Sequence, residues 1–96
     1  MTVYVVAYLT FTNRKAYDGY VVKFASVFAR FEGTLLAADE FPEVLEGQWS
    51  GEKVVLISFP DAAACQRWSD SPDYLDIARD RKAGAEALVM LVKGLS

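Results

Sequence analysis

The stretch VVLISFPDAAACQRWSDSPDY, from Val54 to Tyr74, decides the fold of this chain. It opens with an apolar, strand-forming run that stops at a turn around Pro60. Asp61 is suited to cap a short helix over residues 62–70, and Ser71 followed by Pro72 is a favoured start for a second helix. A strand, a break, a helix, a break and a helix in this order predict a small α+β sandwich.

The chain before this stretch begins with a strand over residues 2–11, where β-branched and aromatic side chains occupy both alternating sets. Asn13 is suited to cap a helix from residue 14 to about residue 31. Gly33 stands where a left-handed helix cap is usual. A second strand is expected over residues 34–38, and a short extended piece over residues 43–46.

The remaining elements complete a βαββαβ order. Residues 53–59 form the third strand, the helix after Pro72 extends to about Gly84 with Leu75 and Ala78 on its inner face, and residues 86–93 form the last strand. This order predicts one domain, residues 1–96, with the ferredoxin-like βαββαβ sandwich fold. Its class is α+β, with a four-stranded antiparallel sheet and all helices on one face because crossovers are right-handed.

The strands are apolar on both faces, and 53% of the residues are hydrophobic. An apolar sheet face left open in a small domain would favour association. We therefore expect a homodimer packed sheet to sheet through the open face, which is the arrangement of a dimeric α+β barrel. A charge at Val5 or at Leu56, whichever side is open, should then give a monomer or an aggregate.

The composition excludes several kinds of chemistry. The chain has no histidine and only Cys65 as a thiol, so catalytic triads, thiolate clusters and most metal sites are excluded, and we expect no metal and no cofactor. A net charge of -3 argues against nucleic acid as a partner, and no apolar run is long enough for a membrane. One cysteine fits a reducing compartment, so the expected location is cytoplasmic. We expect Cys65 to be a buried, inert thiol.

Four residues are candidates for ligand binding: Tyr8, Trp68, Tyr74 and Arg79. Trp68 and Tyr74 could form the lip of a pocket, although packing at a corner between two helices is the more common role of such residues. Arg79 and Arg81 could clamp an anion through their guanidinium groups, but pairing of Arg79 with Asp76 is the commoner role. Tyrosine hydroxyls could turn into a cavity or serve the core, a choice that applies to Tyr4, Tyr8, Tyr17 and Tyr20. The catalytic residues, if any exist, are unknown.

A family resemblance rests on short motifs spread over nearly the whole chain. They are Glu46-Gly47 with Trp49, Phe59-Pro60, Ala63, Trp68, Ser71-Pro72-Asp73-Tyr74, Arg79 and Val92-Lys93-Gly94. With them the chain resembles the DUF1330 family of uncharacterised small proteins, in the dimeric α+β barrel superfamily. The resemblance implies a ferredoxin-like fold and a sheet-to-sheet homodimer, and it carries no reaction. Residues 36–41 (LAADEF) differ from the corresponding segment of the family, which contains glycine and arginine.

Three hypotheses about function remain open at this point. The first is a cytoplasmic homodimer that binds a small, partly apolar or anionic molecule between sheet and helices. The second is a cofactor-independent monooxygenase-like or isomerase-like enzyme that uses the same pocket, by analogy with members of the wider superfamily. The third is a structural or regulatory dimer without a ligand. The second requires a cavity of at least ~300 Å³ with convergent polar groups.

Overall fold

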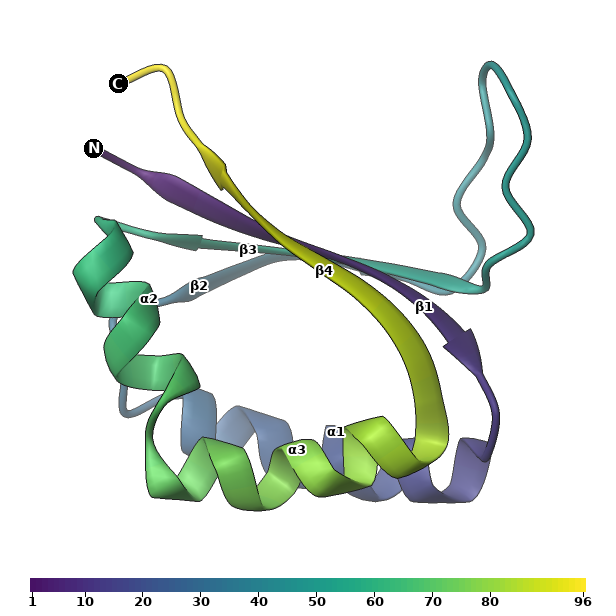
Figure 1. Cartoon of the computed structure of the whole chain (residues 1–96), viewed down its shortest axis with the longest axis horizontal. Helices are drawn as coiled ribbons and strands as arrows, with labels where there is room; N and C mark the ends of the chain where they lie inside the picture. Colours follow the sequence, from purple (N-terminus) through teal and green to yellow (C-terminus); the bar gives the residue numbers. More distant parts are fainter.

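The computed structural model describes all residues from 1 to 96 and forms one α+β sandwich (Figure 1). The elements are β1 (Val3–Phe11), α1 (Arg14–Phe28), β2 (Thr34–Asp39), β3 (Lys53–Phe59), α2 (Ala62–Ser69), α3 (Pro72–Gly84) and β4 (Ala85–Lys93). A sheet with the strand order β2-β3-β1-β4 carries the helices on a single face. All of its pairings are antiparallel. This is the ferredoxin-like βαββαβ fold that the sequence predicts, with its second helix divided in two.

The register of the sheet decides which apolar face is covered. Val5 in β1 lies opposite Ile57 of β3, and both side chains are buried beneath the helices. The next residue, Val6, lies opposite Leu56 in β3 and Met90 in β4. Because side chains alternate along a strand, this second set points away from the helices. The open face is therefore the side of Leu56, and Val5 belongs to the core.

Helix α1 begins as the sequence predicts but ends one turn earlier. The side chain of Asn13 accepts a hydrogen bond from the backbone N–H of Ala16 at 3.2 Å, which caps the first turn. The helix ends at Phe28, and Ala29 caps it in a right-handed conformation. The predicted left-handed cap at Gly33 is wrong, since Gly47 alone has a positive φ, of 90°. Gly33 is needed for space instead, because a Cβ there would press on two buried phenylalanine rings.

The corner between α2 and α3 forms through the expected caps. The Asp61 carboxylate accepts from the N–H of Ala64 at 2.8 Å, and the Ser71 hydroxyl accepts from the N–H of Tyr74 at 3.1 Å. In α3 the buried residues include Tyr74, Ile77 and Ala78, whereas Leu75 is 52% exposed. The prediction for Leu75 is only partly right: the buried stripe starts at Tyr74 and repeats every three to four residues, and Leu75 borders the space between sheet and helices. None of the helices is long and apolar enough to cross a lipid bilayer.

The segment between β2 and β3, residues 40–52, contains neither strand nor helix, so the extended piece expected over residues 43–46 is not a strand. This loop rises on the side of the sheet that faces away from the helices (Figure 1). At its start, Glu40 receives two hydrogen bonds from the guanidinium of Arg14, at 2.7 and 2.8 Å. At its end, the Glu52 carboxylate accepts from the N–H of Phe11 at 3.0 Å. The start of the loop is thus hydrogen-bonded to the start of α1, and its end is hydrogen-bonded to the end of β1.

Candidate functional site

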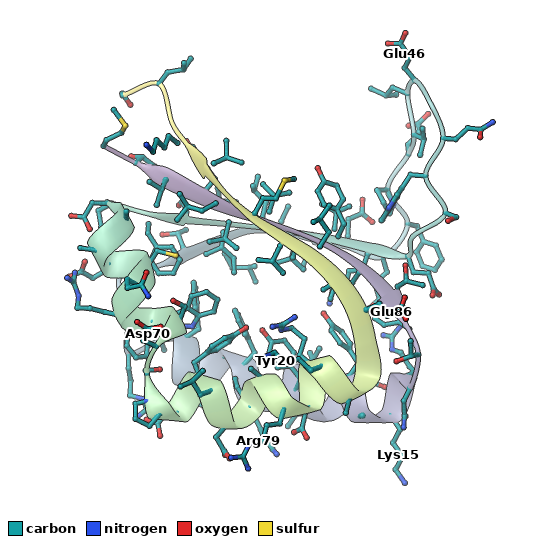
Figure 2. All side chains as sticks on the ribbon, viewed as in Figure 1. Lys15, Tyr20, Glu46, Asp70, Arg79 and Glu86 are labelled. Atoms are coloured by element: carbon teal, nitrogen blue, oxygen red, sulfur yellow. The ribbon has the colours of Figure 1, made fainter.

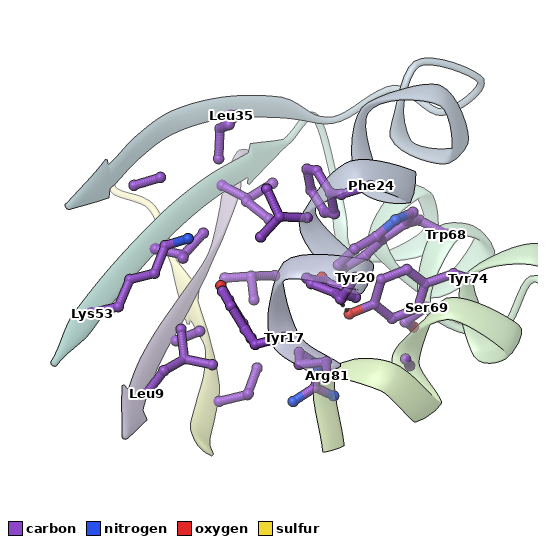
Figure 3. Close-up of a pocket in the computed structure, with 18 of the residues that line it drawn as sticks. Leu9, Tyr17, Tyr20, Phe24, Leu35, Lys53, Trp68, Ser69, Tyr74 and Arg81 are labelled. Atoms are coloured by element: carbon purple, nitrogen blue, oxygen red, sulfur yellow. Dashed lines mark hydrogen bonds between the residues drawn. The ribbon is translucent and has the colours of Figure 1, made fainter. Parts of the chain in front are cut away.

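A cavity of about 460 Å³ lies between the sheet and the helix layer (Figure 3). Of its 21 lining residues 17 are hydrophobic, so its character is mainly apolar. The sheet contributes inward side chains such as Val5, Val55 and Ile57, and α1 and α3 form the opposite wall. The volume lies in the range of pockets that hold small-molecule ligands. The large side chains of the helix layer therefore do not fill the sandwich completely.

Aromatic rings form much of the wall on the helix side. Tyr17, Tyr20 and Phe24 follow one another at steps of three and four residues along α1, which brings them to the same helix face. Trp68 at the end of α2 and Tyr74 at the start of α3 lie with their ring centroids 4.2 Å apart. The corner of the two helices is thus also a wall of the cavity. Trp68 and Tyr74 therefore pack against each other at the helix corner and also line the cavity.

Two hydroxyl groups meet at this wall. The hydroxyls of Tyr20 and Tyr74 lie 3.1 Å apart and are buried. Burial raises the pKa of Tyr20 far above its ordinary value, and the neighbouring Tyr74 raises it further. Tyr20 therefore stays protonated at neutral pH. In such a pair one hydroxyl proton forms the mutual hydrogen bond, and the other proton remains free to be donated.

Three cationic side chains line the cavity, namely Lys53, Arg81 and Lys82, of which Lys82 is exposed. Lys53, at the start of β3, is only 7% exposed and forms neither an ion pair nor a hydrogen bond with another side chain. Its ammonium lies 4.8 Å from the centre of the Tyr17 ring, within the range of a cation–π contact. The carboxylate of nearby Glu40 is already bound by Arg14 through both oxygens, at 2.7 and 2.8 Å. Arg81 in α3 is the second cation and takes part in no ion pair.

Two buried N–H groups of the lining have no partner. They are Nε1 of Trp68 and Nε of Arg81. Buried polar atoms are nearly always hydrogen-bonded in folded proteins, so each unpaired donor needs an explanation. No aspartate or glutamate lines the cavity. The site thus combines an apolar, aromatic wall with spare donors and positive charge, which suits an apolar molecule that carries hydrogen-bond acceptors.

The structure brings together two of the four residues that the sequence singled out, Trp68 and Tyr74. Tyr8 points to the open face of the sheet, where its ring lies 5.9 Å from that of Trp49 in a shallow groove. Arg79 is exposed, lines neither hollow and points away from the sheet (Figure 2). The expected pairing of Arg79 with Asp76 is also not formed.

Arg79 and Arg81 are two positions apart in the sequence, but their side chains leave α3 in different directions. Residues two apart on a helix point in nearly opposite directions, so only Arg81 reaches the cavity. Lys53 lines the cavity but was not among the residues that the sequence singled out. Its signal was the alternation in β3, where Lys53 shares the inward set with Val55, Ile57 and Phe59. A lysine in the inward set of an apolar strand marks a cavity that can host its ammonium group.

Cys65 lies in α2 and is 7% exposed. Burial raises the pKa of the Cys65 thiol, which keeps it protonated and unreactive. The residue is absent from the cavity lining. The interpretation of Cys65 as a buried thiol is confirmed.

Comparison with known proteins identifies the family. Residues 2–95 match the family model described as "Domain of unknown function (DUF1330)", so the chain belongs to the DUF1330 family. No curated protein matches the chain. The predicted family resemblance is therefore confirmed, and the family description assigns no activity.

Several solved structures are similar to this one. RPA0582, a protein of unknown function from Rhodopseudomonas palustris, is 19% identical with a TM-score of 0.82, over 99% of this chain and 83% of that one. SnoaB, a cofactor-independent oxygenase from Streptomyces nogalater, is 19% identical with a TM-score of 0.74, over 99% and 94%. A dimeric ferredoxin-like protein of unknown function from Jannaschia sp. CCS1 is 18% identical with a TM-score of 0.74, over 98% and 100%. At these identities the likeness shows the fold.

Proposed function

We propose that this protein is a homodimer that binds one small, largely apolar molecule per chain in the cavity between sheet and helices. The observation that carries the proposal is the cavity of about 460 Å³ with unpartnered donors in its wall. A pocket of this size with an apolar lining and a few polar groups is typical of small-molecule sites. Trp68 and Tyr74 are the binding residues retained from the sequence analysis, and Lys53, Tyr20 and Arg81 join them.

The homodimer is supported by the open face of the sheet. Leu88, Met90 and Val92 of β4 lie on this face and are 58%, 41% and 44% exposed. The loop on the same side carries Phe41 and Leu45, which are 90% and 89% exposed. Large apolar side chains that gather on one face favour a protein partner. We propose a second copy of the same chain as this partner, by analogy with the dimeric ferredoxin-like protein from Jannaschia.

The enzyme hypothesis uses the same cavity and takes its support from SnoaB, a cofactor-independent oxygenase of the same fold. Cofactor-free oxygenation of a phenol requires a base that removes a proton from the substrate. The lining offers tyrosines, lysines and an arginine but no carboxylate and no histidine. This set of side chains supports binding of an anion more directly than proton abstraction. Binding is therefore the function that we put first.

Native mass spectrometry of the protein purified gently from its own cells tests the proposal. A dimer mass with an additional small mass per chain is the expected result, and the extra mass would identify the compound. A monomer would contradict the dimer. A dimer that stays free of ligand, both from the cells and after incubation with an extract of their small molecules, would favour the structural or regulatory dimer. The cytoplasmic location stays a prediction from the single cysteine.

A further inference from the structure

The cavity holds more hydrogen-bond donors than its own side chains can use. Nε1 of Trp68 and Nε of Arg81 are buried without a partner. The Tyr20–Tyr74 hydroxyl pair has two protons and uses one for its mutual bond at 3.1 Å. The residues that line the cavity therefore carry three donors without an acceptor, and a buried donor without an acceptor costs free energy. A bound molecule that supplies acceptors would remove this cost.

These donors belong to one group on the helix side of the cavity. Arg81 lies close enough to Tyr20 for its positive charge to favour the tyrosine's ionised form. Tyr20 bonds to Tyr74, whose ring lies 4.2 Å from the ring of Trp68. Figure 3 shows Trp68, Tyr74, Tyr20 and Arg81 side by side along the helices that bound the cavity.

The charge of the cavity has no internal counterpart. Arg81, Lys53 and Lys82 are cationic, none of them forms an ion pair, and no acidic side chain lines the wall. Two carboxylates of α3 are engaged on the outer surface: Asp73 with Arg30 at 2.8 Å and Asp80 with Lys23 at 3.0 Å. A cation in an apolar site is stabilised by an anionic partner. A ligand that carries a negative charge would supply such a partner.

From this arrangement we infer that the ligand is an aromatic carboxylate, whose carboxylate accepts hydrogen bonds from Arg81 and from the Tyr20–Tyr74 pair. The inference rests on the proposed ligand-binding function and names its substrate class. The guanidinium of arginine matches the geometry of a carboxylate. The rings of Trp68, Phe24 and Tyr17 offer faces and edges to an aromatic body. Lys53 adds positive charge from the sheet side of the same cavity.

The test compares matched probes on the ¹⁵N-labelled, full-length protein. 2-Naphthoate and 2-naphthamide have the same ring system, and only the first is an anion, while decanoate is an anion without a ring. The indole N–H resonance of Trp68 and the Nε–H resonance of Arg81 report on contact between the probe and these residues. A Trp49→Phe variant assigns the two indole signals. We expect 2-naphthoate to shift the Trp68 and Arg81 signals and to bind at least about tenfold more tightly than the amide, a difference of about 1.4 kcal/mol.

The matched variants are Arg81→Met and Arg79→Met, since the two arginines lie on opposite sides of the same helix. Arg81→Met should weaken 2-naphthoate at least about tenfold and leave 2-naphthamide nearly unchanged. Arg79→Met should change neither affinity. Arg81→Gln keeps a polar side chain at this position without the charge and should behave like Arg81→Met. Thermal unfolding of each variant shows whether its fold is intact.

The outcomes separate the inference from the proposed function. If acid and amide bind equally and Arg81→Met has no effect, the carboxylate inference fails and the ligand-binding function stands. If decanoate binds as tightly as 2-naphthoate, the aromatic part of the inference fails. If no probe, charged or neutral, shifts the Trp68 resonance, both the inference and the function proposed for this cavity are overturned.

Discussion

The hydroxyl groups of Tyr20 and Tyr74 lie 3.1 Å apart and join α1 to α3 at the wall of the cavity. The two residues are 54 positions apart in the chain, and each is 8% exposed. Their contact shows how the fold positions the candidate site. Each tyrosine belongs to the inward stripe of its own helix, and the antiparallel packing of the helices brings the two stripes together.

This contact predicts non-additive effects in a double-mutant cycle. Tyr20→Phe and Tyr74→Phe each leave one buried hydroxyl without its partner, so each should lower the free energy of unfolding by about 1–3 kcal/mol. The double variant removes both hydroxyls and should lose less than the sum of the single losses. Urea unfolding of the four proteins measures the difference. Additive losses would mean that the hydrogen bond does not contribute to stability.

A second prediction concerns the space around Gly33. A Cβ there would lie 2.8 Å from the ring of Phe59 and closer still to that of Phe28, and both rings are buried. Gly33→Ala should therefore destabilise the protein by about 1–3 kcal/mol, because a packed core resists added volume. Gly19→Ala is the matched control, since its nearest neighbour is Asp80 Oδ2 at 3.7 Å. In helix α1 this second change should stabilise by about 0.5–1 kcal/mol. Urea unfolding checks both signs.

A third prediction follows from the contact of Arg14 with Glu40. The hydrogen bonds from Arg14 hold the pKa of the Glu40 carboxyl below its ordinary value. A lowered pKa means that the contact stabilises the fold above the ordinary pKa of a glutamate and loses this effect as the pH falls through the lowered value. NMR titration of the Glu40 carboxyl should show the lowered pKa. Protection factors for hydrogen exchange in residues 40–52, which correct for the intrinsic pH dependence of exchange, should fall over the same pH range.

The control for this prediction is Arg14→Gln, which should return the pKa of Glu40 towards its ordinary value and remove the pH step in hydrogen exchange. Added salt should reduce the effect, since both side chains are solvent-exposed in part. A pKa of Glu40 that is the same in both proteins would contradict the assignment.

The fold could be predicted from the sequence because its signals are local. The caps at Asn13, Asp61 and Ser71 and the alternation of the strands are each encoded within a few residues. The end of α1 was harder to predict, because Phe31 continues the apolar stripe although the helix stops at Phe28. Phe31 packs on the core from a turn instead. A stripe of apolar residues does not distinguish a helix from a chain that folds back over the same core.

The site could be predicted only in part, because a cavity is a property of packing between distant segments. Trp68 and Tyr74 lie in one short motif and were found together. Lys53 and Arg81 are separated by 28 positions, and nothing near either residue in the sequence indicates that the two lie at one cavity. Only the three-dimensional arrangement shows that both face a common space without an acidic partner.

The last prediction concerns the open face of the sheet. Leu56 lies at its centre, opposite Val6 in β1 and Ala37 in β2. Leu56→Asp would bury a carboxylate in the proposed dimer interface, where an unpaired charge is strongly unfavourable. We expect a monomer or an aggregate, measured by size-exclusion chromatography with light scattering. Val22→Asp introduces the same charge on the far side of α1, where Val22 is 81% exposed, and should leave a dimer. A dimer that survives Leu56→Asp unchanged would refute sheet-to-sheet assembly, while loss of the dimer in both variants would point to a general effect of the added charge.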